Sequence, residues 1–180
     1  PTVREKAYCV MKIISIKAPI IMLFLTGITP SFEQDLPVLG YLERSKIGPV
    51  GVTLIGKLDT GADMSSLGYT KLFKFKKKGR RWVRFTVKDE LGINHDFELP
   101  VVGTSKIRRR RGGASIKRPV VEMKICVGNI SAMTLVNLSN RKRFSTKLLI
   151  GRSFLHRRAL VDSSRALKTE LSCSDKDIKQ

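Results

Sequence analysis

An apolar stretch that ends in a tight polar turn constrains this chain more than any other feature. The stretch is Val52–Leu58, and the turn Asp59-Thr60-Gly61-Ala62 follows it directly. A carboxylate at the end of a buried strand sits where water is scarce, and a glycine two residues later lets the backbone turn without a Cβ clash. The stretch therefore predicts a strand that delivers Asp59 to a site for acid–base chemistry. The tripeptide Asp-Thr-Gly also occurs as an ordinary strand-ending turn, which is the simpler interpretation of this segment.

The sequence downstream of this turn resembles the retropepsin-like aspartic peptidases. In that family, an apolar-Asp-Thr-Gly-Ala-Asp motif is matched by a later apolar-apolar-Gly-Arg-x-x-Leu motif. This chain carries Asp59–Asp63 and, about ninety residues later, Leu149–Leu155. From Gly40 to Leu155 it is also similar to a bacterial retropepsin-like family often labelled "ATP-dependent zinc protease". The resemblance implies an all-β fold, a small closed acid-protease (retropepsin-like) barrel with one short C-terminal helix.

Alternating segments predict an all-β chain independently of this resemblance. Trp82–Val87 and His95–Val101 alternate apolar and polar residues on either side of a turn, and Val120–Val127 with Ala132–Asn137 form a second such pair. Alternation with a period of two is typical of half-buried strands, and short, evenly spaced strands favour a small barrel or sandwich. Only Arg152–Arg157 is expected to be helical.

The length of 180 residues suits one domain with tails. We expect residues 36–167 to form a retropepsin-like aspartic peptidase domain and residues 168–180 to be a polar, disordered tail. The apolar segment Ala18–Ile28 is too short to span a bilayer comfortably but has the length of a signal-peptide core. Residues 1–35 are therefore predicted to be an export signal or N-terminal anchor plus linker, with an apolar core helix as the remaining alternative. The expected location is periplasmic or membrane-anchored in a bacterium, with membrane contact only through this segment.

The net charge of +20 favours acidic partners. Nucleic acid, anionic lipid and acidic polypeptides all fit such a charge, and a merely solvated basic surface fits it too. One basic cluster, Lys74–Arg81, lies in the connection before the segment Trp82–Val87 and is expected to be a solvated loop. Nucleic acid is disfavoured because few aromatic residues accompany this cluster. The second cluster precedes a Gly-Gly pair and is expected to concentrate acidic substrates near the site; it consists of Arg108, Arg109, Arg110 and Arg111.

An aspartic peptidase needs two carboxylates that share a proton, and this chain offers a single Asp-Thr-Gly. The retropepsin resemblance implies a symmetric homodimer in which the Asp59 side chains of the two subunits become neighbours. The alternative for Arg152 is a surface charge at a helix start, and the Gly-Gly pair could equally be an inert hairpin turn. The resemblance implies a catalytic turn of Thr60, Gly61 and Ala62, substrate-binding or dimer-bracing roles for Asp63 and Arg152, and a flap tip at Gly112 and Gly113.

Other chemistries have less support. Asp162 follows an apolar run but lacks the glycine, so it is a weak rival for Asp59. His95 and His156 are far apart, and no zinc-protease or P-loop motif occurs, so no metal and no cofactor are expected. The cysteines, Cys9, Cys126 and Cys173, show no Cys-x-x-Cys spacing, which predicts neither a zinc site nor a disulfide framework, with Cys126 in the core.

The sequence thus predicts an aspartic endopeptidase in which paired Asp59 carboxylates of a homodimer activate water. The bacterial family is sometimes associated with ligases that add amino acids to peptides, which together with the basic charge implies acidic or glutamyl-rich peptides as substrates. The alternative is a catalytically inactive basic binding module on the same fold, for nucleic acid or anionic surfaces.

Overall fold

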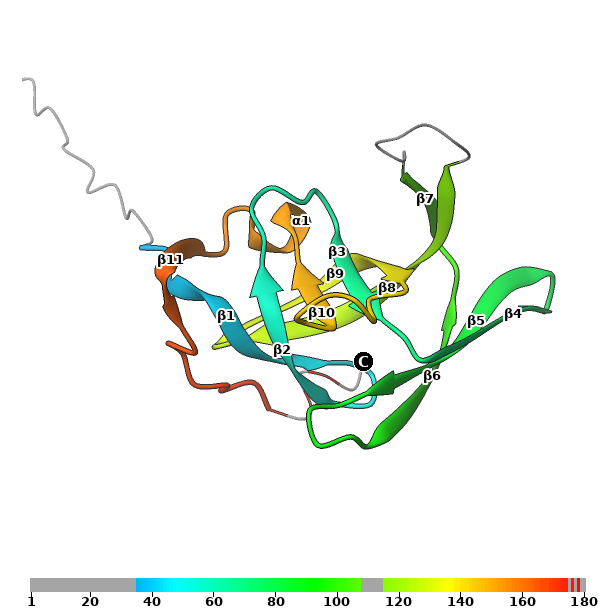
Figure 1. Cartoon of the computed structure of the whole chain (residues 1–180), viewed down its shortest axis with the longest axis horizontal. Helices are drawn as coiled ribbons and strands as arrows, with labels where there is room; N and C mark the ends of the chain where they lie inside the picture. The colour runs from blue at the N-terminus through cyan, green and yellow to red at the C-terminus, as the bar shows by residue number, and fades with distance from the viewer. Residues whose placement is uncertain (1–34, 108–114, 175, 177, 179–180) are drawn as a thin grey trace, which may run out of the picture. The chain divides into compact units, whose positions relative to one another are not determined.

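The computed structural model describes residues 35–107, 115–174, 176 and 178 (Figure 1). In this part of the chain nearly all regular structure is β, as the sequence predicts, and the one helix is short. The elements are β1 (Val38–Ile47), β2 (Val52–Leu58), β3 (Ser65–Gly68), β4 (Lys71–Lys77), β5 (Arg80–Lys88), β6 (Asn94–Pro100), β7 (Gly103–Ile107), β8 (Ile116–Val127), β9 (Ile130–Ser139), β10 (Leu148–Ile150), α1 (Arg152–Leu155) and β11 (Leu160–Ala166).

The main sheet closes on itself. Its strand order is β11-β1-β2-β10-β3-β9-β8-β7, and β1 pairs with β8 as well as with β2. A ring therefore runs β1–β2–β10–β3–β9–β8 and back to β1, with β11 and β7 outside it. Within the ring, β10 lies between β2 and β3, parallel to β2 and antiparallel to β3. Because β2 and β10 are parallel, the segments that follow them leave the sheet at the same edge.

Alternation places one face of each strand in the core. On β2, Val52, Leu54 and Leu58 point inward and are buried, whereas Thr53 and Lys57 are exposed. Inward residues of the other ring strands pack against them, and Phe154 of α1 is completely buried in the same cluster. Full burial of one such side chain contributes about 1.5–3 kcal/mol, so this shared core holds the ring together.

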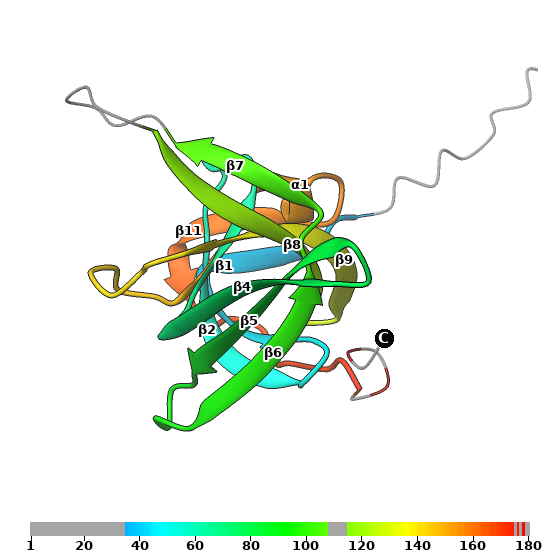
Figure 2. The ribbon, with the colours of Figure 1, turned by 90° about the vertical axis from the view of Figure 1, so that its right-hand side faces the viewer.

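The segment Lys71–Pro100 forms a separate three-stranded sheet, β4-β5-β6. The predicted hairpins β5–β6 and β8–β9 are confirmed. The basic cluster Lys74–Arg81 was expected to be a connecting loop, which is wrong: it is the tip of the β4–β5 hairpin (Figure 2). The sheet is anchored through the inward face of β5 and β6, where Phe85 and Phe97 stack with ring centroids 5.1 Å apart.

The tail after Leu167 was expected to be disordered, and its described residues instead pack on the domain. The backbone N–H groups of Lys168 and Thr169 donate to the buried Glu43 carboxylate at 3.2 and 3.1 Å. Ile178 is completely buried. A disulfide joins Cys173 to Cys126 on β8, so the expectation of no disulfide is also wrong. Polar composition misled the prediction because each of these contacts is with a distant part of the sequence.

Residues 1–34 lie outside the described residues, so the export segment stays a prediction. Among the residues that the structure describes, no helix is long and apolar enough to cross a membrane. Helix α1 ends at Leu155, two residues before the predicted end, and Arg157 adopts a left-handed φ of 56°.

Candidate functional site

Asp59 stands where β2 ends, and its own turn orients it. Its backbone N–H donates to the carbonyl oxygen of Ile150 on β10 at 2.9 Å. Its side-chain Oδ1 accepts from the Gly61 N–H at 3.0 Å, and its carbonyl accepts from the Ala62 N–H at 3.2 Å. The Asp59 side chain is half-buried, while Thr60 and Gly61 are exposed. The turn thus presents one oriented carboxylate at the rim of the core.

The downstream motif around Gly151-Arg152 holds this turn through hydrogen bonds. The Arg152 N–H donates to the carbonyl of Ala62 at 2.8 Å, and the Ser153 N–H donates to that of Asp63 at 3.0 Å. The Arg152 guanidinium donates to the carbonyl of Thr60 at 3.0 Å and forms an ion pair with the Asp63 carboxylate. The structure therefore brings Asp59–Asp63 and Arg152 together within one subunit. Roles for Asp63 and Arg152 in substrate binding or dimer bracing stay predictions.

A layer of buried polar residues supports β3 directly after the turn, and sequence reasoning missed it. The Asn137 side chain on β9 donates to the carbonyl of Ser65 at 2.9 Å and accepts from the Ser66 hydroxyl at 3.1 Å. The Ser65 hydroxyl accepts from the Gly151 N–H at 3.1 Å. The one available signal was a pair of serines inside a short apolar strand. A fully satisfied buried network fixes a single arrangement of these strands.

Arg141 lies in the electrostatic neighbourhood of Asp59, and Arg118 lies in that of Arg141. Arg141 is only 7% exposed, donates to the carbonyl of Thr146 at 3.1 Å and lies 4.4 Å from the centre of the Phe144 ring. Burial lowers the pKa of the Arg141 guanidinium, the charge of Arg118 acts in the same direction, and the charge of Asp59 opposes both. Arg118 itself donates to Asn137 Oδ1 at 3.3 Å. The Asp59 carboxylate thus has at least one buried cation, the Arg141 guanidinium, within its electrostatic reach.

The proposed flap tip, Gly112 and Gly113, and the cluster Arg108–Arg111 lie outside the described residues. The strands on either side of them pair in antiparallel register, from Gly103 opposite Val120 to Ile107 opposite Ile116. This β7–β8 hairpin and the β2–β3 connection that carries Asp59 project toward the same side of the domain (Figures 1 and 2).

The remaining candidates take part in local contacts. Asp162 Oδ1 on β11 accepts from the backbone N–H and the hydroxyl of Ser164 at 2.9 and 2.6 Å, and these bonds lower the pKa of that carboxyl. His95 Nε2 lies 2.9 Å from Asp89 Oδ2 at the β5–β6 turn. No group of three or more His, Cys, Asp or Glu side chains that could hold a metal occurs in the described residues.

The two halves of the motif have their counterpart in a known family. The sequence model of the RimB-like family, described as retropepsin-like aspartic endopeptidase RimB, matches residues 38–170. The chain belongs to the RimB-like family. The match covers the Asp59 turn, the Gly151-Arg152 motif and every described strand, so the resemblance found in the sequence is confirmed.

Relatives of this RimB-like chain include parts of larger proteins. A probable alpha-L-glutamate ligase of Shewanella pealeana (strain ATCC 700345 / ANG-SQ1) is 28% identical over 135 residues, which cover 72% of this chain and 29% of the ligase. A probable alpha-L-glutamate ligase of Parasynechococcus marenigrum (strain WH8102) is 26% identical over 131 residues, which cover 69% of this chain and 28% of the ligase. The chain thus spans less than a third of these relatives.

A solved structure shares the fold over its whole length. The crystallised protein, from Legionella pneumophila subsp. pneumophila str. Philadelphia 1, has unknown function and is assigned to DUF785. It is 35% identical, with a TM-score of 0.64, and the match covers 76% of this chain and 100% of that one.

Proposed function

We propose that this protein is an aspartic endopeptidase that works as a homodimer, with one Asp59 from each subunit. The observation that carries the proposal is the Asp59 turn, whose carboxylate is oriented by the Gly61 N–H and whose backbone is held by Ile150 and Arg152. A turn that served only to end a strand would not need this reinforcement from a segment so far away in the sequence. Membership of a retropepsin-like family supports the same reading.

The chemistry follows from pairing two carboxylates. Two such groups in contact cannot both be charged, so the pair holds one proton between them. The charged member accepts a proton from water as the water oxygen attacks the scissile carbonyl carbon, and the protonated member donates to the carbonyl oxygen. Collapse of the resulting diol then breaks the C–N bond: the amine nitrogen takes up the proton of the pair, and one diol hydroxyl gives its proton to the other carboxylate, which leaves a carboxylic acid product and restores the singly protonated pair. No metal or cofactor is required by these steps.

A symmetric dimer is the simplest source of the second carboxylate. The chain has a single Asp-Thr-Gly, and the carboxylate of the rival Asp162 is already engaged by Ser164 and Arg165. Thr60 and Gly61 are exposed on the monomer, so the turn is accessible to a second copy. A twofold axis through the turn would bring the two Asp59 residues together.

We propose acidic, glutamyl-rich peptides as the substrate class. The net charge of +20 favours acidic partners. The curated relatives are named as glutamate ligases, and this chain matches only a minor part of each. A peptidase domain related to part of a glutamate ligase is expected to act on chains of the amino acid that such an enzyme is named for.

We also propose that the domain is exported. The apolar segment Ala18–Ile28 suits a signal sequence, and the Cys126–Cys173 disulfide supports the proposal because such bonds persist in oxidising compartments. Alkylation of both cysteines by a membrane-permeant reagent in intact cells would contradict it.

The Asp59→Asn variant tests the mechanism. The amide keeps the shape of the side chain but cannot act as an acid or a base, so hydrolysis of a peptide that the wild type cleaves should fall by at least about 10²–10⁴-fold. Light scattering and circular dichroism should show an unchanged dimer and fold. Asp162→Asn is the matched control and should retain wild-type activity. Equal rates for wild type and Asp59→Asn would overturn the aspartic mechanism and favour a binding module.

A further inference from the structure

A pocket of about 390 Å³ lies between the β4–β5 hairpin and β8, on the part of the chain that carries the first basic cluster. Lys74, Lys76 and Arg81 line it from the hairpin, and Lys117 and Arg118 line it from β8. Pro119 contributes to its apolar wall. The described residues that line the pocket include no Asp or Glu. The pocket is therefore strongly positive and is partly shielded from water.

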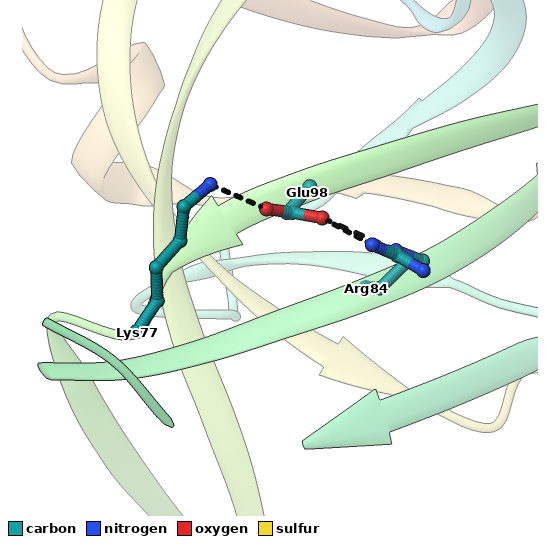
Figure 3. Close-up of polar contacts among 3 residues, drawn as sticks. All are labelled: Lys77, Arg84 and Glu98. Atoms are coloured by element: carbon teal, nitrogen blue, oxygen red, sulfur yellow. Dashed lines mark hydrogen bonds and ion pairs between the residues drawn. The ribbon is translucent and has the colours of Figure 1, made fainter. Parts of the chain in front are cut away.

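The β4–β5 hairpin separates its charges between two faces. On the outer face, Glu98 Oε1 pairs with Lys77 Nζ at 2.9 Å and Glu98 Oε2 pairs with Arg84 Nη2 at 2.7 Å (Figure 3). Hydrogen bonds from Arg84 and Lys77 lower the pKa of Glu98, so these charges are neutralised locally. Lys76 and Arg81 are cross-strand partners on the opposite face. Across residues 35–107 and 115–174, none of the five pocket cations has a carboxylate partner.

The pocket connects to the catalytic turn through Arg118. Its guanidinium donates to Asn137, which in turn donates to the carbonyl of Ser65, six residues after Asp59. Arg118 and Asp59 also act with opposite sign on the same buried guanidinium, that of Arg141. Arg118 therefore lines the pocket and is also linked, through one side chain, to the strand that follows the Asp59 turn.

We propose that this pocket binds acidic side chains of the peptide substrate away from the cleaved bond, with Lys76, Arg81 and Arg118 as specificity-determining residues. The proposal rests on the peptidase function proposed above. Guanidinium groups match carboxylates with two parallel hydrogen bonds, and an apolar wall strengthens such pairs by excluding water. Glutamate side chains are long enough to reach several cations from an extended backbone.

A nucleic acid carries negative charge, as an acidic peptide does, but it is the weaker candidate for the ligand of this pocket. Binding of single strands relies on aromatic rings with free faces on which bases stack. Here Lys77 Nζ lies 4.8 Å from the centre of the Trp82 ring, and the Arg84 guanidinium lies 5.9 Å from that of Phe75. Trp82 and Phe75 both line the pocket, and each already has a cation over its ring.

Two triple variants with the same loss of charge test the pocket. The first, Lys74→Gln/Lys76→Gln/Arg81→Gln, removes three pocket cations. The matched control, Lys71→Gln/Lys77→Gln/Arg80→Gln, removes three cations from the opposite face of the same hairpin and leaves Arg84 to pair with Glu98. Arg108–Arg111 stay unchanged in both. Each triple is made in the full-length chain carrying Asp59→Asn, so that binding can be measured without cleavage.

Fluorescence anisotropy with labelled octaglutamate at physiological salt gives the readout, with octaglutamine as the neutral probe. The pocket triple should weaken octaglutamate binding by about tenfold, because three charge contacts are lost, and the control triple by no more than about twofold. Equal losses in both triples would show that only overall charge matters and would overturn the proposal. So would octaglutamine binding as tightly as octaglutamate, or an unstructured RNA 12-mer binding more tightly and losing affinity only in the pocket triple.

The same triples without Asp59→Asn separate this inference from the peptidase function. If the wild type cleaves peptides, the pocket triple should raise KM for a glutamate-flanked peptide and leave kcat/KM for its glutamine-flanked counterpart unchanged. If the wild type cleaves nothing but the anisotropy result holds, the peptidase function fails and the acidic-peptide pocket stands.

Discussion

Gly151 illustrates how closely the two halves of the site are packed. A Cβ at this position would lie 2.7 Å from the carbonyl carbon of Met64 and 2.9 Å from the carbonyl oxygen of Ala62. Both are backbone atoms of the loop that follows Asp59, and they cannot move aside as a side chain would. Its φ of −93° is ordinary, so packing and not backbone conformation requires glycine here.

Gly151→Ala should therefore lower the free energy of unfolding by about 1–3 kcal/mol, the usual cost of overpacking, and reduce peptidase activity by displacing the Asp59 turn. Urea denaturation and peptide hydrolysis measure the two effects. Gly103→Ala is the control, since its Cβ would come no closer than 3.7 Å to the side chain of Val120. Similar losses in both variants would show that crowding at the turn is not the cause.

The three-stranded sheet β4-β5-β6 stores charge pairs that respond to pH. A hydrogen bond with His95 lowers the pKa of Asp89 below its ordinary value of 3.8. Hydrogen bonds from Arg84 and Lys77 lower the pKa of Glu98 below its ordinary value of 4.5. A carboxyl whose pKa is lower in the folded state stabilises the fold above its unfolded pKa, and this contribution is lost as pH falls through the folded value.

We therefore expect the free energy of unfolding to fall as pH is lowered below about 4.5, in part through these two groups. Glu98→Gln should flatten this dependence, because the variant has no carboxyl at this position to titrate. Glu122→Gln, on exposed β8 surface, should keep the wild-type slope. Urea titrations across the range provide the comparison, and an unaltered slope in Glu98→Gln would contradict the assignment.

Local patterns predicted most elements but not their partners. Strict alternation identified β5 and β6, and the apolar run before Asp59 identified β2. The strand β4 was missed because its lysines resemble a solvated loop, and only pairing with β5 makes it a strand. Likewise, Asn137 carries no local signal, because its partners Ser65 and Ser66 are 72 and 71 residues away in the sequence.

Across the whole domain, the described part of the C-terminal tail is fixed at two places. Glu43 accepts hydrogen bonds from Gly40, Lys168 and Thr169, and Cys173 is bonded to Cys126 with a Cα–Cα distance of 6.3 Å. The two bridged cysteines are 47 residues apart, and closing a loop of that length restricts the unfolded chain.

Cys173→Ser should lower the free energy of unfolding by about 2–4 kcal/mol, the range typical for a loop of this size. Dithiothreitol should reproduce this loss in the wild type and have no further effect on the variant, as measured by denaturant unfolding. A wild type whose midpoint is insensitive to dithiothreitol would show that the bridge contributes little.

The parallel pairing of β2 with β10 also governs when the site can form during translation. Arg152, whose guanidinium donates to the carbonyl of Thr60, is synthesised 92 residues after Thr60. A ribosome that has synthesised β2 therefore displays Asp59 without the strand and guanidinium that position it, and these emerge only when most of the domain has left the exit tunnel. A nascent or prematurely terminated chain is consequently expected to lack the oriented Asp59 turn until synthesis of the domain is nearly complete.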